Sequence, residues 1–139
     1  MIASGYLLLI RRGKILLLRR YHTGYEDGKY SVPAGHVEDN EELKASTCRE
    51  IKEEIGNSLK PQDLKLVHVM HRKEDDIRMD FFFTTEKRGL KPRNAEPAKA
   101  DDMRWFALDR LPANTIPYIR AAIENYRNGV FYTAFGWHK

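Results

Sequence analysis

The chain has 139 residues, of which 42% are hydrophobic, and 24 Lys and Arg residues against 20 Asp and Glu residues. This length suits one folded domain with a real core, and we expect a single domain over residues 1–139. The small positive excess favours ordinary solubility over an anion-attracting field. A single cysteine excludes an internal disulfide, and neither a secretory leader nor an apolar run of membrane-spanning length is visible, so we expect a cytoplasmic protein.

The first elements along the chain are predicted to form a hairpin. Apolar residues at 5–10 and 15–18 indicate two strands, and the polar stretch between them indicates the turn. Residues 21–29 are polar and predict a loop. Residues 30–32 then lead into Pro33, which forces the residue before it into an extended conformation.

A helix is predicted next, over residues 40–55. Asp39 or Asn40 can cap its start, because a short polar side chain there can accept a hydrogen bond from the first turn. Gly56 suits the left-handed position after the helix end, since glycine adopts that conformation without a steric penalty.

The second half of the chain predicts a mixed architecture. Strands are expected over 64–71 and 78–85, and the phenylalanine run at 81–83 indicates burial on both faces of the second strand. The remaining predicted elements are a loop over 88–100, a strand over 103–108 and a helix over 116–127. Helices and strands follow one another without a regular βαβ rhythm, so we predict an α+β fold with a mixed sheet flanked by helices.

Three glutamates crowd one face of the first predicted helix. Glu50, Glu53 and Glu54 span an arc of roughly 100° at helical spacing, where like charges repel. The neighbouring basic residues, Arg49 and Lys52, are expected to point elsewhere. A solvated acidic surface is one explanation. The other is a hard divalent cation such as Mg²⁺, which prefers oxygen ligands.

The spacing around these glutamates decides between the two explanations. Residues 35–56 read Gly-x5-Glu-x7-Arg-Glu-Ile-x-Glu-Glu-x-Gly, which resembles the Nudix hydrolase superfamily at every fixed position. Asn57 departs from the family, which usually places Ile, Leu or Val there, and we expect it to pack. Residues 30–38 and the stretch 104–112 also resemble the family. The resemblance implies the Nudix αβα sandwich.

The resemblance also implies roles for particular residues. The implied ligands of Mg²⁺, or of Mn²⁺, are Glu50, Glu53, Glu54 and the backbone carbonyl of Ala34. Arg49 is expected to orient a catalytic glutamate through a charge-assisted pair, and Glu41 to secure the loop before the helix. The alternative for both is an ordinary surface ion pair.

The general base of the implied reaction is not fixed by the motif. Glu53 is the first candidate, and Glu50 is the other catalytic carboxylate expected on the same helix face. The family varies at this point, so Glu96 in the long predicted loop is an alternative base or an additional metal ligand. The competing interpretation of Glu96 is a loop carboxylate in solvent.

Substrate contacts are expected from three places. Gly35 belongs to the turn against which the glutamates lie, and Arg20, Tyr21 and Tyr25 stand in or beside the loop that precedes it. Asn114 resembles the residue with which MutT-like members read a guanine edge, since an amide offers a donor and an acceptor side by side. The competing interpretation of Asn114 is a helix N-cap.

Several other reactive side chains are interpreted as packing residues. Cys48 shares the apolar arc of its helix, which argues against a nucleophile. His68 and His71 are three residues apart on a strand and so face opposite sides, which does not suit one shared metal. Trp105 and Phe106 are expected in the core rather than as a stacking platform for a base.

Together these patterns predict a MutT-like enzyme that hydrolyses a nucleoside triphosphate to a monophosphate and diphosphate. The alternatives are another Nudix class, such as an ADP-sugar hydrolase, and a catalytically weak nucleotide-binding module. The basic residues are scattered along the sequence, so we expect no nucleic-acid partner. The expected partner is a small nucleotide, with no membrane contact, in a monomer or homodimer.

Overall fold

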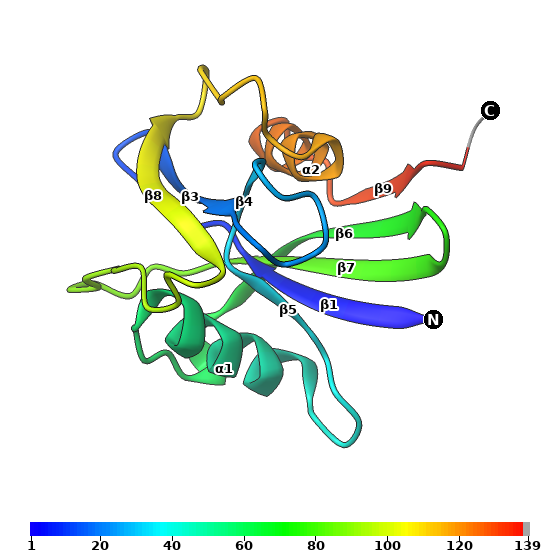
Figure 1. The fold of residues 1–139 in the computed structure, drawn as a ribbon. Helices are drawn as coiled ribbons and strands as arrows, with labels where there is room; N and C mark the ends of the chain where they lie inside the picture. The colour runs from blue at the N-terminus through cyan, green and yellow to red at the C-terminus, as the bar shows by residue number, and fades with distance from the viewer. Residues whose placement is uncertain (138–139) are drawn as a thin grey trace.

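The computed structural model describes residues 1–137 and places two β-sheets between two helices (Figure 1). The larger sheet has the strand order β5-β1-β7-β6-β9. Its strands are β1 (Ile2–Leu7), β5 (Ala34–His36), β6 (Lys65–Lys73), β7 (Ile77–Thr84) and β9 (Tyr132–Phe135). The pairs β1–β7 and β6–β9 are parallel, whereas β1–β5 and β6–β7 are antiparallel. The predicted mixed sheet is therefore confirmed.

The smaller sheet is antiparallel and lies beside one end of the larger one. It consists of β2 (Ile10–Arg11), β3 (Lys14–Arg20), β4 (Tyr30–Ser31) and β8 (Ala100–Ala107). β3 is its centre and pairs with each of the other three strands.

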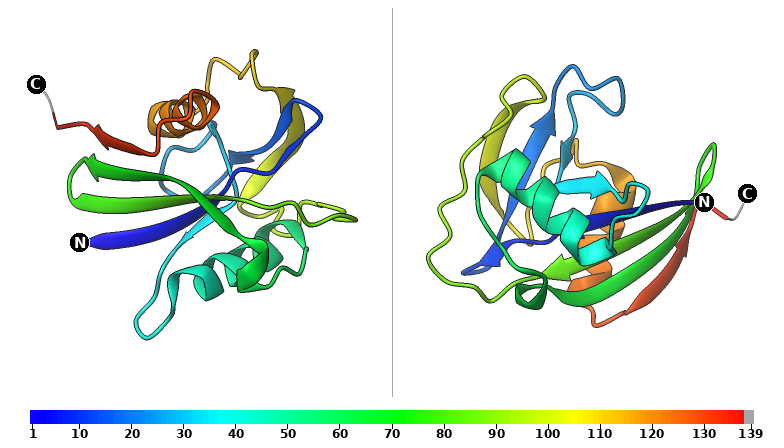
Figure 2. Two further views of the ribbon diagram at one scale, coloured as in Figure 1. Left: turned by 180° about the vertical axis from the view of Figure 1, so that it is seen from behind. Right: turned by 90° about the horizontal axis from the view of Figure 1, so that it is seen from below.

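Two helices complete the layers: α1 (Leu43–Ile55) on one side and α2 (Pro117–Arg127) on the other, with a short 3-10 helix at Pro61–Asp63. The views from behind and from below show that the strands separate the two helices (Figure 2). This is the predicted αβα sandwich. Neither helix in residues 1–137 is long and apolar enough to cross a membrane.

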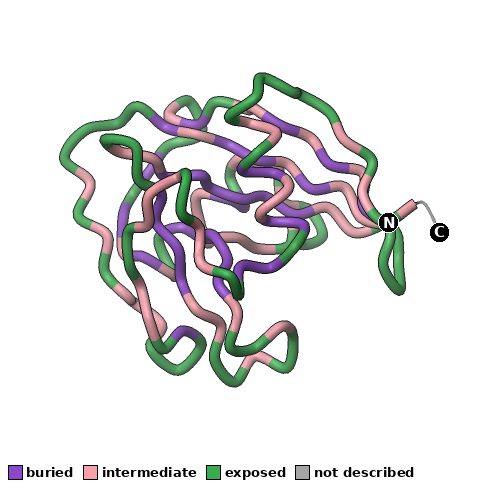
Figure 3. Tube along the Cα trace, turned by 90° about the horizontal axis from the view of Figure 1, so that it is seen from above, coloured by how far each residue is buried: buried purple, intermediate pink, exposed green. Residues whose placement is uncertain are grey.

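The core consists of two clusters of buried residues, one under each helix. Figure 3 shows the buried segments of the chain in purple. Phe82 and Phe83, both fully buried, point to opposite faces as successive strand residues must. Phe82 belongs to the cluster under α2 with Ile119, and Phe83 belongs to the cluster under α1 with Ile51. The predicted burial of this strand on both faces is confirmed.

The predicted hairpin at the N-terminus is partly wrong. The first apolar run is not one strand, because β1 ends at Leu7 in the larger sheet and β2 begins at Ile10 in the smaller one. The chain crosses between the sheets at Leu8 and Leu9, which are fully or almost fully buried. Burial on all sides, rather than a continuous strand, explains the unbroken run.

The first helix begins three residues later than predicted, and its cap is different. Glu42 caps α1, since its carboxylate accepts a hydrogen bond from the backbone N–H of Ala45 at 3.0 Å. Asn40 has a φ of 65° and belongs to the turn before the helix, so neither it nor Asp39 is the cap. Gly56 has a φ of 73° and ends the helix as predicted.

Other differences lie at short or weakly patterned strands. β9 and β5 were not expected, because four- and three-residue strands show little alternation, and β8 begins at Ala100 instead of 103. α2 begins at Pro117 with Ile116 in the cap position.

Candidate active site

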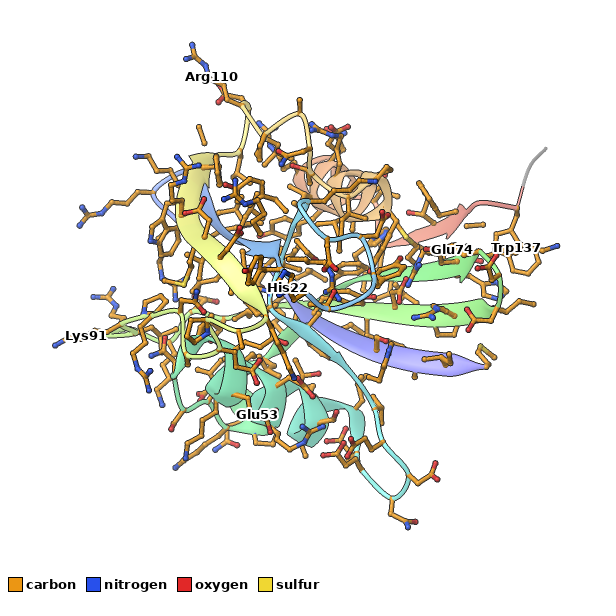
Figure 4. All side chains as sticks on the ribbon, in the orientation of Figure 1. His22, Glu53, Glu74, Lys91, Arg110 and Trp137 are labelled. Atoms are coloured by element: carbon orange, nitrogen blue, oxygen red, sulfur yellow. The ribbon has the colours of Figure 1, made fainter. Side chains whose placement is uncertain are left out.

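One cavity of about 600 Å³ is lined by residues from both sheets, both helices and the 21–29 and 86–99 loops. The lining falls into two groups. The first, called the carboxylate end, holds Glu50, Glu54 and Glu96, whose charges act on one another. The second, called the aromatic end, holds aromatic and polar side chains, among which Tyr6 is hydrogen-bonded to Tyr118 and Ser4 to His36; its members are Ser4, Tyr6, Tyr25, His36, Arg78 and Tyr118. Figure 4 shows the side chains around this region, with Glu53 on α1 and His22 in the loop above the strands.

The carboxylate end depends on a close approach between β5 and α1. Gly35 lies directly against Glu50, and a Cβ at this position would overlap the Glu50 side chain. The next residue back, Ala34, donates its backbone N–H to Oε1 of Glu54 at 3.1 Å. Only glycine fits where β5 meets α1, which explains why Gly35 stands at this position of the motif.

The protonation of these glutamates is altered by their surroundings. Burial raises the pKa of Glu54 well above its ordinary value, the Ala34 N–H opposes that rise, and the charges of Glu50 and Glu96 add to it. Burial also raises the pKa of Glu50, against the lowering influence of Arg49. Crowded, desolvated carboxylates of this kind mark functional sites more often than ordinary surfaces.

Arg49 does not point away from the glutamates, contrary to the prediction. Its guanidinium donates to both oxygens of Glu41 at 2.8 and 3.0 Å, to Glu50 at 2.9 Å and to Glu53 at 3.2 Å. The long Arg49 side chain thus contacts the next residue of its helix, the residue one turn later, and the loop before the helix. The Arg49 hydrogen bonds lower the pKa of Glu41 to about 2. The expected charge-assisted pair of Arg49 with a helix glutamate is thus present, and Glu41 joins the loop before the helix to Arg49.

The three glutamates of the helix differ in position. The Glu50 side chain is 19% exposed, whereas that of Glu53 is 47% exposed and lies beside Arg49, outside the cavity lining. Glu96 comes from the distant 86–99 loop and does line the cavity, with Lys99 at 3.9 Å. The cavity therefore brings Glu96 to Glu50 and Glu54, while Glu53 stands at its margin.

Of the predicted loop contacts, two line the cavity. Arg20 lines it and donates to the backbone carbonyl of Tyr25 at 2.6 Å and to Thr23 at 3.0 Å, which fixes the loop to the end of β3. Tyr25 lines the cavity as well. Tyr21 is not part of the lining; its ring stacks on that of His22 and is 37% exposed.

Asn114 is not the cap of α2, and it lies outside the lining of the cavity. The helix cap is Ile116, and Asn114 is an exposed residue outside the cavity lining. Its side-chain amide donates to the backbone carbonyl of Gly28 at 2.9 Å, and its own carbonyl accepts the N–H of Tyr30. It therefore anchors the end of the 21–29 loop to the segment before α2.

The residues interpreted as packing residues mostly pack. Cys48 lies against the cluster under α1, and burial raises the pKa of its thiol. His68 is fully buried and hydrogen-bonded on both ring nitrogens, and His71 lies against Trp137. Asn57 is also buried and donates to the carbonyl of Lys91 at 3.1 Å.

The core interpretation of Trp105 is wrong. Phe106 packs against the cluster under α2, but Trp105 is 38% exposed, because it stands on the opposite face of an edge strand. Sequence reasoning also missed Tyr6 and Tyr118 as cavity residues. Tyr6 lay inside an apolar run and Tyr118 inside an amphipathic helix, so both resembled core residues.

The donor set at the carboxylate end fits Mg²⁺ or Mn²⁺. Within residues 1–137, no three His, Cys, Asp or Glu side chains are already gathered into a closed metal cluster. Mg²⁺ does not require one, since it is usually bound by one or two carboxylates together with waters and substrate phosphates. The desolvated, mutually repelling oxygens of Glu50 and Glu54 are the ligands such a hard cation prefers.

Comparisons with known proteins agree with this geometry. The family model described as the NUDIX domain matches residues 1–126. The phosphatase NudJ of Escherichia coli (strain K12) is 28% identical over 123 residues, covering 86% of this chain and 79% of NudJ. The NAD-capped RNA hydrolase NudC of Stutzerimonas stutzeri (strain A1501) is 29% identical over 118 residues, which are 81% of this chain but 39% of NudC.

Solved structures show the same architecture. The MutT NUDIX hydrolase from Burkholderia pseudomallei superimposes with a TM-score of 0.80 at 28% identity, covering 88% of this chain and 95% of that one. The matched part includes mixed sheets between two helices, as described above.

Proposed function

Because the chain belongs to the Nudix family, whose hydrolases act on nucleoside diphosphate derivatives, we propose that it hydrolyses a nucleoside triphosphate with the help of Mg²⁺. The products would be a nucleoside monophosphate and diphosphate. The observation that carries the proposal is the cavity, in which crowded carboxylates at one end face aromatic and polar groups at the other.

The carboxylates of Glu50 and Glu54 and the carbonyl of Ala34 would hold the metal ion, and Glu96 would add a ligand from the 86–99 loop. When bound, the ion lowers the pKa of a water molecule and neutralises phosphoryl charge. Glu53 would join the set by turning from Arg49 into the cavity, because its helix position faces the same side. Gly35, which also lines the cavity, would let the Glu50 carboxylate lie against the β5 backbone.

The other charged groups of the cavity would position the phosphates. Arg20 and Lys99 also line the cavity, Lys99 at 3.9 Å from Glu96, and would supply the cations that a polyphosphate needs. Arg49 would act from behind the wall, because its hydrogen bonds to Glu41 and Glu50 fix the orientation of the catalytic face. A glutamate within hydrogen-bond reach of the attacking water, Glu53 or Glu96, would remove its proton.

A substrate panel tests the proposal. Nucleoside triphosphates, nucleoside diphosphates, an ADP-sugar and NAD would be offered to the purified chain with Mg²⁺, Mn²⁺ or EDTA, and phosphate and diphosphate release would be measured. We expect turnover of a triphosphate with diphosphate release, which EDTA abolishes while the melting temperature shows that the fold persists. Turnover in EDTA would reject the metal assignment, and preferred cleavage of the sugar or dinucleotide would reject the triphosphate.

A further inference from the structure

A charged residue lies fully buried beneath the aromatic end of the cavity. Arg72, on β6, has no exposed surface, and neither has its partner Asp80 on β7. The guanidinium donates to Asp80 through Nε at 2.6 Å and through Nη2 at 3.3 Å. Neither residue reaches the cavity, so the proposed reaction does not use them directly.

Burying such a pair has no obvious benefit for stability. Taking two charges out of water costs free energy that their attraction barely offsets, and apolar residues of similar volume often stabilise a fold as well or better. Arg72 therefore needs an explanation beyond stability, and its contacts supply one.

Arg72 is connected to three tyrosines that line the cavity. Its guanidinium carbon lies 3.6 Å from the centre of the Tyr118 ring, which rests on the cation. Through Asp80 it fixes Tyr6, whose hydroxyl donates to Oδ1 of Asp80 at 2.8 Å. The hydroxyls of Tyr6 and Tyr118 are themselves 3.1 Å apart.

The third tyrosine is reached through Glu74, which directly follows β6 and is labelled in Figure 4. Arg72 donates its Nη1 to Glu74, and Tyr25 donates its hydroxyl to both oxygens of the same carboxylate at 3.1 and 3.2 Å. Tyr25 belongs to the 21–29 loop, so this hydrogen bond joins the loop to the end of β6. Burial raises the pKa of Tyr6 and Tyr25, so that both hydroxyls stay protonated as donors.

The chemistry of this end suits a nucleobase. Tyr25, which is 36% exposed, offers stacking surface to a flat heterocycle, and the buried Tyr6 and Tyr118 contribute an aromatic lining to the same cavity. The carboxylate end and its cations suit phosphates instead. We propose that Arg72 is a positioning residue that holds Tyr6, Tyr25 and Tyr118 as the binding site for the nucleoside half of the substrate, an inference that rests on the proposed function. Lysine would not reproduce these contacts, because its compact ammonium lacks the planar fork that donates to Asp80 from two nitrogens while the Tyr118 ring lies against it.

Two probes separate the ends of the cavity. A nucleoside monophosphate carries a base and inorganic diphosphate does not, so their dissociation constants with Mg²⁺, measured by calorimetry, report on different ends. We expect Arg72→Lys to weaken monophosphate binding about 5- to 100-fold, the range of one lost base-stacking contact, and to change diphosphate binding less than about 2-fold. KM for the triphosphate should rise while kcat stays within about 3-fold.

A second set of variants leaves Arg72 and Asp80 in place, which keeps the proposal testable if Arg72→Lys does not fold. Tyr25→Phe and Glu74→Ala should each weaken monophosphate binding. The double variant should be no weaker than Glu74→Ala, because Glu74→Ala already removes the acceptor of the Tyr25 hydroxyl. Asp75→Asn, an exposed carboxylate next to Glu74, is the matched control and should change nothing.

Equal losses for both probes, additive effects of Tyr25→Phe and Glu74→Ala, or unchanged binding in every variant would overturn the proposal. A wild-type chain that binds monophosphates but hydrolyses no nucleotide would reject the proposed function instead, and the ratio of the two dissociation constants would still decide the role of Arg72.

Discussion

The two ends of the cavity are built in different ways. The carboxylate end comes mostly from one continuous stretch, residues 34–54, with Glu96 as the contribution from elsewhere. The aromatic end takes its lining from β1, the 21–29 loop, β5, β7 and α2, and its tyrosines are held by residues on and beside β6 and on β7. A site made from one stretch leaves a spacing pattern in the sequence. A site assembled from five elements leaves none, because each of its residues resembles an ordinary core or loop residue.

The largest effect on turnover is expected at the carboxylate end. Glu50→Gln and Glu54→Gln should each lower kcat by about 10²–10⁴-fold, because the neutral amide neither binds a divalent cation well nor accepts a proton. Steady-state kinetics at saturating Mg²⁺ would measure this. Glu124→Gln, an exposed glutamate on α2, is the control.

Glu53→Gln sharpens the same test, because Glu53 lies outside the cavity lining. A fall in kcat as large as that of Glu54→Gln would mean that Glu53 leaves Arg49 when substrate binds. Near wild-type rates in Glu50→Gln and Glu54→Gln would remove the chemistry from this end altogether.

A smaller effect is expected on the stability of the fold when Glu54 is substituted. The pKa of Glu54 is raised in the folded protein, mainly by burial, so this group stabilises the fold below its unfolded pKa and loses that contribution as pH rises through the folded pKa. Without metal, Glu54→Gln should therefore be more stable than the wild type at neutral pH, by about 0.5–2 kcal/mol, and the gain should shrink toward pH 4.

Melting temperatures in EDTA between pH 4 and 8 would show this difference, and Mg²⁺ should stabilise the wild type more than the variant. If Glu54→Gln were less stable than the wild type at pH 8, the hydrogen bond from Ala34 would outweigh the cost of burying the charged Glu54 carboxylate.

These expectations also show what the sequence could predict. The glutamate face, Gly35 and the helix end at Gly56 follow from local spacing and backbone preference, and the layered fold follows from the pattern of strands and helices. The prediction was wrong where a long side chain had a choice of partners. Arg49 was expected to point away from the glutamates, yet it donates to Glu50 and Glu53. The position of a residue on a helix does not determine where the guanidinium of a long arginine side chain lies.

The aromatic end could not be predicted for a related reason. Tyr6 has an apolar neighbour on one side and lies near apolar residues along β1, and only the pairing of β1 with β7 brings it close to Asp80. Arg72 follows a histidine on a strand and carries no spacing signal. Such contacts depend on strand register, which is a property of the whole sheet.

A moderate effect is expected at Asn114, which joins the loop to the segment before α2. Asn114→Ala removes the hydrogen bond to Gly28, so the loop should close less well over the aromatic end. We expect KM to rise about 2- to 5-fold, alike for all four bases, with a loss of about 0.5–1.5 kcal/mol in stability. Kinetics with four nucleoside triphosphates, beside Asn128→Ala as an exposed control, would measure it. A fall in kcat/KM confined to one base would instead support the base-reading role of Asn114.

The smallest effect is expected at Cys48, which lies on α1 but belongs to neither end of the cavity. Its side chain packs against the cluster that contains Ile51 and Ile55, and burial, followed by the charges of Asp63 and Glu42, raises the pKa of the thiol. A thiol that resists ionisation is a poor nucleophile, so Cys48→Ala should keep turnover within about 2-fold and lose about 1 kcal/mol of stability from the packing it gives up. Turnover and melting temperature of the variant, with the rate of alkylation of the wild type at pH 7, are the measurements. Rapid stoichiometric inactivation by the alkylating reagent, together with an inactive but stable Cys48→Ala, would place the reaction on α1's apolar side and undo the assignment of the chemistry to the glutamates.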